Sequence, residues 1–444
     1  MQPEKIHPVD EVLPYGQLFA CGLQHVMAMY AGCVAVPLII ANAIGLSKDQ
    51  LIYLINADLF TVGIATIIQS LGFLNMGVKL PVVQGVSFAA VTPMIMVGKA
   101  HGIQGIFGAV IVAGIITYLI SPYFGRFLRY FPPVVTGTII TLIGVSLLPV
   151  AVRWAGGGVP GTPDFASPAN LGMTFAVLVL TVIYYRYLPG FWSSIAVLLG
   201  LVSGTAIAFA CGLTDFSKVA TAGWFGLTTP FAFGMPIFDP MAILTIVLAM
   251  LVIMTETTGD MIAVGEMVGK PVKQEDVVRG LRADGFATML GGIMNTFPYS
   301  AFAQNVGLVG LTGVRSRFVI VAAGVILVVL GLFPKAAAIV AAIPAPVLGG
   351  AGIAMFGMVA ASGIRALGKV SFEGNYNAMI VAVSLGVGLI PLAVPGFYGK
   401  LPAWAQMFLN SGITIGSIIA VGLNFCFNEL GRQDVAPGQK AADN

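Results

Sequence analysis

The chain is a succession of apolar runs, each about as long as a membrane-spanning helix, and this pattern limits its fold more than any other feature. A helix needs roughly 20 apolar residues to cross the hydrocarbon core of a bilayer. Of the 444 residues, 58% are apolar and 9% are charged, and the mean hydropathy is +0.96. A soluble domain typically carries about a quarter charged residues. The sequence therefore predicts an all-α polytopic membrane protein.

We expect 14 transmembrane segments, seven on each side of a polar inter-repeat loop at 213–238. Two of them, 81–98 and 298–313, open with a proline and mix small, polar and apolar residues. A polar tail follows at 428–444. The predicted spans are 16–41, 51–71, 81–98, 102–120, 132–150, 169–187 and 191–211 in the first half, and 239–259, 277–296, 298–313, 316–334, 337–363, 373–394 and 404–427 in the second.

The positive charges are divided unevenly between the two sides that this arrangement defines. The even-numbered connections and both tails together hold 15 Lys and Arg residues, whereas the odd-numbered connections hold 6. Cytoplasmic loops of membrane proteins are enriched in these residues. We therefore expect both termini in the cytoplasm of a multi-pass protein of the plasma membrane, which in a bacterium is the inner membrane.

Seven spans in each half is an odd number, so 1–212 and 239–427 must cross the bilayer in opposite directions, as inverted repeats. The two unusual segments match: Pro81 precedes Ser87 by six residues, and Pro298 precedes Gln304 by six. Broken segments at matching places of inverted repeats mark the binding site of many transporters. Non-helical backbone persists at membrane depth only where protein buries it or it lines a cavity. We expect two short extended segments that pair; two kinked helices are the alternative.

Ionisable side chains inside the spans are functional candidates, because burying them is costly unless they are paired or hydrated. Glu256 and Asp260 are four residues apart, so they share one face of a helix. Two acids so placed suit reversible proton uptake. For Asp260, a position at the cytoplasmic end of its span is the alternative. His25 lies near the middle of the first span, either as a structural histidine bonded to a carbonyl or as a functional one.

Other polar residues in the spans are less decisive. Asp284 follows Arg279 and Arg282, so a salt bridge or a helix cap competes with a functional role. We expect Asp58 to act as a cap or to be solvated near an outer end. Gln304 and the following Asn305 offer donors and acceptors without charge, which suits a planar ligand with N–H and C=O edges, although a sugar or an amino acid would also fit.

Several classes of protein are disfavoured. The four cysteines lie singly in apolar runs without metal-binding spacing, and the three histidines are scattered. The sequence shows no pattern typical of a nucleophile–base pair or of a metal cluster. We therefore expect neither an enzyme nor a metal or organic cofactor. The net charge of +3, without a basic cluster, argues against nucleic-acid binding.

The motifs of the chain resemble those of the nucleobase–ascorbate transporters. Their signature, an amide or acid followed by N-x-G-x(4)-T, reads here QNVGLVGLTG, with Gln304, Asn305, Gly307 and Thr312 in place. GLQH in the first span, QGVSF in the third, ETTGD in the eighth and ADG in the ninth follow in family order. The resemblance thus extends over nearly the whole chain.

This resemblance implies 14 spans in two inverted repeats, with short β-strands in spans 3 and 10. Spans 1–4 and 8–11 would form a core domain, and spans 5–7 and 12–14 a gate domain. Glu256 and Gln304 would hold a nucleobase by hydrogen bonds, with Phe88 stacked on its ring and backbone N–H groups near Phe88 and Ala303 adding contacts. His25, Asp284 and Asn305 would support the site and couple it to protons, with Asp260 as a further acid.

The amide at position 304 favours xanthine and uric acid within this family, and the small Ser87 is permissive for the bulkier uric acid. Gly310 and Gly313 depart from the signature of some relatives. The resulting hypothesis is a secondary active transporter that imports a purine nucleobase by proton symport, in lipid and as a homodimer. The alternatives are a uracil or other nucleobase permease, sodium coupling, or an anion transporter or channel of similar architecture.

Overall fold

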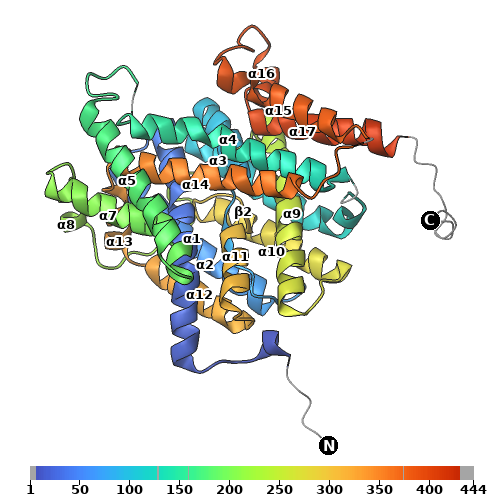
Figure 1. Ribbon diagram of the computed structural model, residues 1–444, viewed down its shortest axis with the longest axis horizontal. Coiled ribbons are helices and arrows are strands. Elements are labelled where there is room, and N and C mark those ends of the chain that lie inside the picture. Colours follow the sequence, from blue (N-terminus) through green and yellow to red (C-terminus); the bar gives the residue numbers. More distant parts are fainter. Residues whose placement is uncertain (1–6, 128–129, 159, 374, 431–444) are drawn as a thin grey trace, which may run out of the picture.

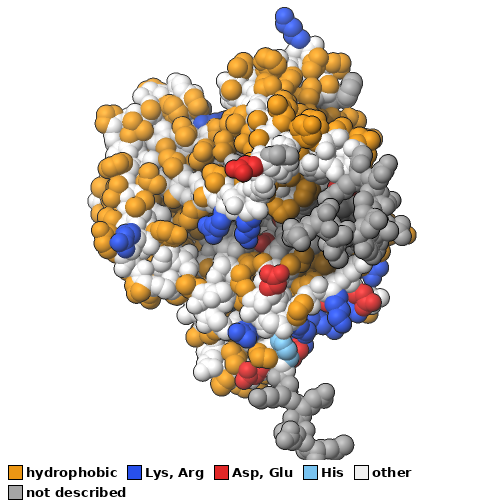
Figure 2. Space-filling model, turned by 45° about the vertical axis from the view of Figure 1, so that its right-hand side comes forward, with side chains coloured by type: hydrophobic (Ala, Val, Ile, Leu, Met, Phe, Trp, Pro, Cys, Tyr) orange, Lys and Arg blue, Asp and Glu red, His pale blue; other side chains and the backbone are white. Residues whose placement is uncertain are grey.

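A computed structural model describes residues 7–127, 130–158, 160–373 and 375–430 and shows a mostly helical chain. The helices of the two sequence halves interleave instead of forming separate lobes (Figure 1). All but the first three residues of the tail predicted at 428–444 lie outside the described residues. Hydrophobic side chains cover much of the face in Figure 2, while charged side chains are few there and gather mainly toward its lower part.

The described elements follow the predicted order of spans. The first half contains η1 (Pro8–Asp10), α1 (Tyr15–Ile44), α2 (Lys48–Leu71), β1 (Gln84–Val86), η2 (Phe88–Ala90), α3 (Val91–Phe127), α4 (Pro133–Ala155), α5 (Pro168–Tyr187), α6 (Phe191–Ser194), α7 (Ala196–Ala210) and α8 (Ser217–Thr221). The second half contains α9 (Pro240–Val268), α10 (Gln274–Ile293), β2 (Tyr299–Ala301), α11 (Ala303–Thr312), α12 (Arg317–Leu330), α13 (Pro334–Ala341), α14 (Ala345–Leu367), α15 (Asn377–Ala393), α16 (Ala403–Leu409), α17 (Gly412–Asn424) and the π-helix η4 (Phe425–Glu429).

Within the described part of the chain, eight helices are long and apolar enough to cross a membrane. The pair α12 and α13, bent by 83° at the break between them, would make a ninth. The multi-span, largely helical architecture is therefore confirmed. The number 14 stays a prediction, because shorter apolar helices such as α7 and α15 fall below the length of a full span.

Prolines and glycines break several apolar runs that look continuous in sequence. The predicted span 337–363 is wrong at its start, since α13 ends at Ala341 and α14 begins only after Pro344. Proline has no N–H to donate and disfavours helix at the residue before it, so the run cannot continue as one helix. In α3, Gly102 has φ +69° and ψ −175°, which separates the predicted spans 81–98 and 102–120 by a kink.

The two broken segments form a small antiparallel sheet, which confirms that they are extended and paired. β1 pairs with β2 in the register Gln84 with Ala301, Gly85 with Ser300 and Val86 with Tyr299. A backbone bond from Ser87 N to Pro298 O, 3.0 Å long, continues the ladder at one end. All six strand residues are buried, so the sheet lies at the centre of the helices and satisfies backbone groups that lipid could not.

Helices of the two halves pack in matched pairs around this sheet. α3 packs on α10 and α2 on α12, while α4 packs on α14. Small residues allow the close approach: a Cβ on Gly285 would lie 2.8 Å from the carbonyl oxygen of Gly114, and one on Gly324 would lie 2.8 Å from that of Gly63. Such small-residue contacts are typical of helix association in membranes, where side chains cannot gain by leaving water.

Candidate functional site

Hydroxyl groups of neighbouring helices hold the short strands in place. Thr66 of α2 accepts a hydrogen bond from the backbone N–H of Gln84 at 3.1 Å, and Thr288 of α10 accepts one from Tyr299 at 3.1 Å. Thr257 of α9 accepts a third from Ala301 at 3.0 Å. These outward-facing N–H groups are not used by the ladder, so the threonines supply partners that a two-stranded sheet otherwise lacks.

Each strand is followed at once by a helix start. Ser87 caps η2 by accepting from the N–H of Ala89 at 3.2 Å, and α3 follows. α11 begins at Ala303, and its N-cap residue Phe302 provides no side-chain cap. The first N–H groups of a helix have no partner within it and carry partial positive charge. The backbone at Ala303 and Gln304 is therefore available to a polar ligand.

A cavity of about 780 Å³ lies where these helix starts meet α9 and α14. All the residues predicted to bind substrate line it, and Asp260 lines it as well. The cavity continues along α5 and α14 to the exposed residues Tyr185, Ser362 and Arg365. The predicted residues on its wall are Ser87, Phe88, Glu256, Asp260, Ala303 and Gln304.

The acids of the cavity wall lie on one face of α9, as the sequence predicts. Glu256 and Asp260 are both partly exposed to the cavity, and α9 continues past them to Val268. No Lys or Arg among the described residues lies within ion-pair distance of either carboxyl. Two acids on a cavity wall without a cationic partner can gain or lose a proton without breaking a salt bridge.

An aromatic cluster forms the apolar part of the wall. The Phe88 ring centroid lies 6.5 Å from that of Phe302 and 5.9 Å from that of Phe356, the second pair edge-to-face. Phe88 is 9% exposed, so its neighbours fix its orientation while its edge remains on the cavity. A ring held in this way can pack against a flat ligand without losing much rotamer freedom on binding.

Three predicted support residues lie behind the wall instead of on it. The Nδ2 of Asn305 donates to the backbone oxygen of His25 at 2.9 Å and lies 3.1 Å from its Nδ1. Because this amide nitrogen can only donate, Nδ1 accepts and the ring hydrogen is on Nε2. Asp284 is fully buried and accepts from Nε2 of Gln69 at 3.3 Å. The salt bridge to Arg279 or Arg282, which the sequence allowed, is not found in the described structure.

Asp58 corrects a sequence expectation. It is neither a helix cap nor solvated, since it lies inside α2 with 1% exposure. Its Oδ1 accepts from Oγ1 of Thr296 at 2.8 Å and from the hydroxyl of Tyr299 at 2.9 Å. The position of Asp58 inside a predicted span was the available signal, because an acid at membrane depth needs hydrogen-bond or ionic partners.

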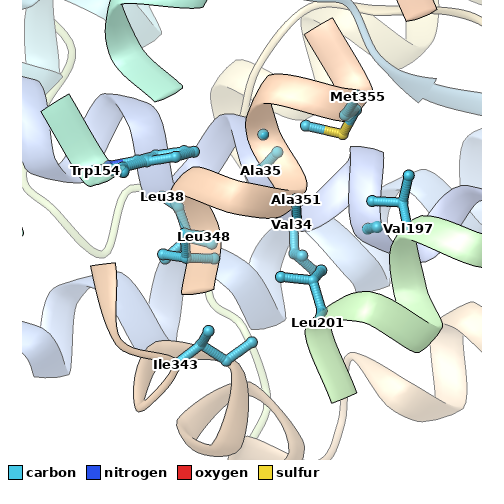
Figure 3. Close-up of a pocket in the computed structure, with 12 residues that line it drawn as sticks. Val34, Ala35, Leu38, Trp154, Val197, Leu201, Ile343, Leu348, Ala351 and Met355 are labelled. Carbon is cyan, nitrogen blue, oxygen red and sulfur yellow. The ribbon is translucent and has the colours of Figure 1, made fainter. Parts of the chain in front are cut away.

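A second, smaller pocket of about 20 Å³ lies away from the acids and is entirely apolar in its labelled lining (Figure 3). Val34 and Leu38 of α1 face Leu348 and Ala351 of α14, and Trp154 of α4 closes one side. This space holds little more than one water and offers that water no partner. The pocket therefore belongs to a dry seam between α1 and the helices α4, α7 and α14.

Outside the spans, an ion-pair cluster ties the N-terminal segment to the second half. Asp10 of η1 accepts from Nε of Arg317 at 2.7 Å and from Nζ of Lys270 at 3.3 Å. Burial alone would raise the pKa of Asp10, but its two cationic partners outweigh burial and hold that pKa below the ordinary value of 3.8. Arg317 also donates to the carbonyl of Leu71 at 2.8 Å, so it connects the start of α12 to the end of α2.

Apolar helices that surround a cavity built at two paired, broken segments define a multi-pass membrane transporter. The chain belongs to the Permease family, whose family model matches residues 16–397, and this confirms the resemblance to the nucleobase–ascorbate transporters. It is 49% identical over 424 residues to the uric acid transporter UacT of Escherichia coli (strain K12), covering 95% of this chain and 88% of that protein. It is 44% identical over 414 residues to the xanthine permease of Bacillus subtilis (strain 168), covering 93% and 94%.

Solved structures share the fold at much lower sequence identity. The transmembrane domain of a cyanobacterium bicarbonate transporter, BicA, superposes with a TM-score of 0.62 at 15% identity, covering 93% of this chain and all of that domain. The structure of SLC26A9 gives a TM-score of 0.59 at 13% identity, covering 93% and 66%. These likenesses concern the fold alone.

Proposed function

We propose that the protein imports xanthine, uric acid or both by proton symport. One observation carries the proposal: a single cavity wall brings together a carboxyl, a carboxamide, an aromatic ring and two helix starts. An oxidised purine is flat, with N–H and C=O groups around its edge, and this set of groups is complementary to it. The names of the two relatives, a uric acid transporter and a xanthine permease, support the same substrate class.

In this proposal Gln304 and Glu256 hydrogen-bond the edge of the nucleobase, and Phe88 packs on its face. Backbone N–H groups at Phe88 and Ala303 add further contacts. Ser87, small and 3% exposed, leaves room for the additional exocyclic oxygen that uric acid carries and xanthine lacks. His25 and Asn305 act from behind the wall by joining α1 to α11, and Asp284 acts there by joining α10 to Gln69 of α2.

Protonation of Glu256, aided by Asp260 or Asp284, would couple transport to the proton gradient. Neutralising a buried acid lowers the cost of moving the loaded site past an apolar barrier. The absence of a cationic partner for Glu256 among the described residues supports this role, because a fixed salt bridge would hold the acid ionised. Sodium coupling is the competing proposal, and the gradient experiment below separates the two.

We place the site between a core domain, spans 1–4 and 8–11, and a gate domain, spans 5–7 and 12–14. The matched packing of α3 on α10 and of α2 on α12 supports two inverted seven-span repeats, because exchanging the halves turns one pair into the other. The cavity extends to Tyr185 and Arg365, on the side for which the positive charges predict the cytoplasm, and this supports the proposal of an inward-facing state with both termini inside. A homodimer in the plasma membrane completes the proposal.

Two alternative substrates are less well supported. A uracil or other nucleobase permease would use the same wall, and the amide at position 304 is what favours purines. The fold shared with the bicarbonate transporter raises an anion transporter or channel as a second alternative. The unpaired acids Glu256 and Asp260 on the cavity wall disfavour a fixed anion there.

The test is uptake of radiolabelled xanthine, uric acid and uracil into bacteria that lack their own carriers for these compounds. We expect saturable uptake of xanthine or uric acid that a protonophore abolishes, and loss of accumulation in Glu256→Gln. Glu266→Gln, on the exposed face of the same helix, is the matched control and keeps wild-type uptake. Uptake of uracil alone would refute the purine assignment, and uptake driven by Na⁺ without a proton gradient would refute proton coupling.

A further inference from the structure

The environment of Asp58 is a closed set of hydrogen bonds that the transport chemistry above does not use. Besides Thr296 and Tyr299, the thiol of Cys33 donates to Oδ2 of Asp58 at 3.1 Å. The hydroxyls of Thr296 and Tyr299 are also 3.1 Å apart, and all three donors are fully buried. The salt bridges of the described chain include none to Asp58. Three donors therefore converge on one carboxyl that has no cation beside it.

These bonds reach the binding wall through β2. Thr296 and Tyr299 lie just before and at the start of that strand, and the residues that follow them, from Ser300 to Gln304, line the cavity. Asp58 itself does not line it. The Asp58 carboxyl thus lies behind β2 and contacts its first residue, Tyr299. The residues that follow Tyr299 line the cavity on the other side.

The other end of the sheet has a comparable acid. Tyr299 pairs with Val86, and Cys33 lies beside the backbone of Val86. Because both Tyr299 and Cys33 donate to Asp58, this carboxyl lies at the Val86–Tyr299 end of the sheet. Asp284 of α10 lies next to Gln84 and Thr257, which belong to the opposite end, where Gln84 pairs with Ala301. The central sheet therefore has one buried acid at each end: Asp58 from the first half of the chain at one end, and Asp284 from the second half at the other.

We propose that Asp58 is a positioning residue for substrate binding: it fixes β2 through Thr296 and Tyr299 and so sets where Ala303 and Gln304 face the cavity. The inference rests on the proposed function for its transport readout. Removing the carboxyl leaves two hydroxyls and a thiol without their acceptor in a site that water does not reach. Such unpaired groups are costly, and the strand shifts to find other partners.

Uptake kinetics of the full chain in membranes test this directly. Asp58→Leu, which removes every acceptor, and Tyr299→Phe are each expected to raise KM for the transported purine about tenfold, and the double variant is expected to be no worse than the poorer single one. Thr296→Ser keeps the hydroxyl and wild-type KM, whereas Thr296→Val does not. Asp49→Leu is the control, because Asp49 is an exposed acid on the same helix.

The outcomes separate positioning from a general role in folding. A folding defect lowers the amount of protein and Vmax while leaving KM unchanged. An unchanged KM in Asp58→Leu, or losses that multiply in the double variant, would overturn the inference. Where Asp58→Leu does not reach the membrane, comparing the KM values of Thr296→Ser and Thr296→Val tests the same hydrogen bond.

A second measurement needs no substrate, so it distinguishes failure of this inference from failure of the proposed function. Cys21, Cys211 and Cys426 are replaced by Ser, the buried Cys33 is retained, and Ala303→Cys serves as a probe for a soluble maleimide. Ala303 is exposed on the cavity. We expect Asp58→Leu to change its labelling rate severalfold, and equal rates with and without the substitution would refute the positioning role.

Discussion

At the scale of single residues, the protein keeps its polar groups in separate local networks. The ligand-facing acids of α9 have no fixed partner among the described residues, whereas Asp58, Asp284 and Asn305 are bonded from behind the wall. The first kind of group is free to change protonation, and the second kind fixes geometry. This division explains why residues that never touch the cavity can still matter for binding.

Asn305→Val is expected to destabilise the fold by about 1–3 kcal/mol, because the buried Nδ1 of His25 loses its only described donor and the His25 carbonyl loses the donor that it has in addition to its bond within α1. Thermal unfolding of the detergent-solubilised protein measures the change. Thr312→Val on the same helix is the control, since its hydroxyl donates to Leu308 within α11 and accepts only from the nearby N–H of Val314, so it forms no hydrogen bond to another helix of the described structure. A melting temperature equal to that of the parent would show that the His25–Asn305 contact adds nothing.

The Asp10 cluster predicts a pH dependence at the N-terminal segment. The folded-state pKa of Asp10 lies below 3.8, so its ion pairs stabilise the fold above that value and are lost as pH falls through the lowered pKa. The contribution stays below about 1 kcal/mol, because partly exposed pairs are screened by water. Limited proteolysis between pH 3 and 6 should show the segment loosening in the parent but already loose, without pH dependence, in Asp10→Asn.

At the scale of elements, close helix contacts explain where small residues are needed. The pairs Gly63–Gly324 and Gly114–Gly285 each bring two backbones together, one in each half of the fold. The contacts fall on α2 with α12 and on α3 with α10, the helices whose threonines and acids hold the central sheet. Helix spacing and strand position are therefore linked.

Gly324→Ala is expected to cost about 1–3 kcal/mol, since the new Cβ would lie 2.8 Å from the Gly63 carbonyl oxygen. Gly386→Ala in α15 is the matched control, with nothing within 4 Å of the added carbon, and should be neutral or slightly stabilising. The comparison is made by thermal unfolding. Equal melting temperatures for the two variants would contradict the close packing of α2 on α12.

The sequence predicts the broken segments well but not the contacts made across long separations. Pro81 and Pro298 reveal where helix stops, and Glu256 and Asp260 share a face by spacing alone. The partners of Asp58 could not be predicted, because Thr296 and Tyr299 are 238 and 241 positions away. The break before α14 was also missed, since the residues around Pro344 are as apolar as the helices on either side.

At the scale of the whole molecule, two spaces of different character lie along α14. The large cavity carries the acids and reaches exposed polar residues, whereas the seam between α1 and α14 is apolar and nearly closed. In the proposed inward-facing state, this seam would seal the outer side. It would have to open when the site faces outward, and its small side chains would permit that movement.

Ala351→Leu is expected to lower Vmax severalfold with little change in KM, because a larger side chain overfills the seam without reaching the acids or Gln304. Uptake kinetics at matched protein levels measure both constants. Ala382→Leu, the same change on the exposed face of α15, is the control. A KM effect of equal size would indicate that the seam and the binding wall are not separable.

The central sheet also dictates an order of assembly. Its two strands are separated by about half of the chain, so β1 has no partner while the ribosome is still making the segment that becomes β2. Until then the nascent first half must leave unpaired backbone groups inside the membrane, or keep β1 near the surface and insert it late. Assembly of the site thus cannot be completed before β2 has been synthesised, and a chain arrested before β2 leaves the polar backbone of β1 without its partner strand.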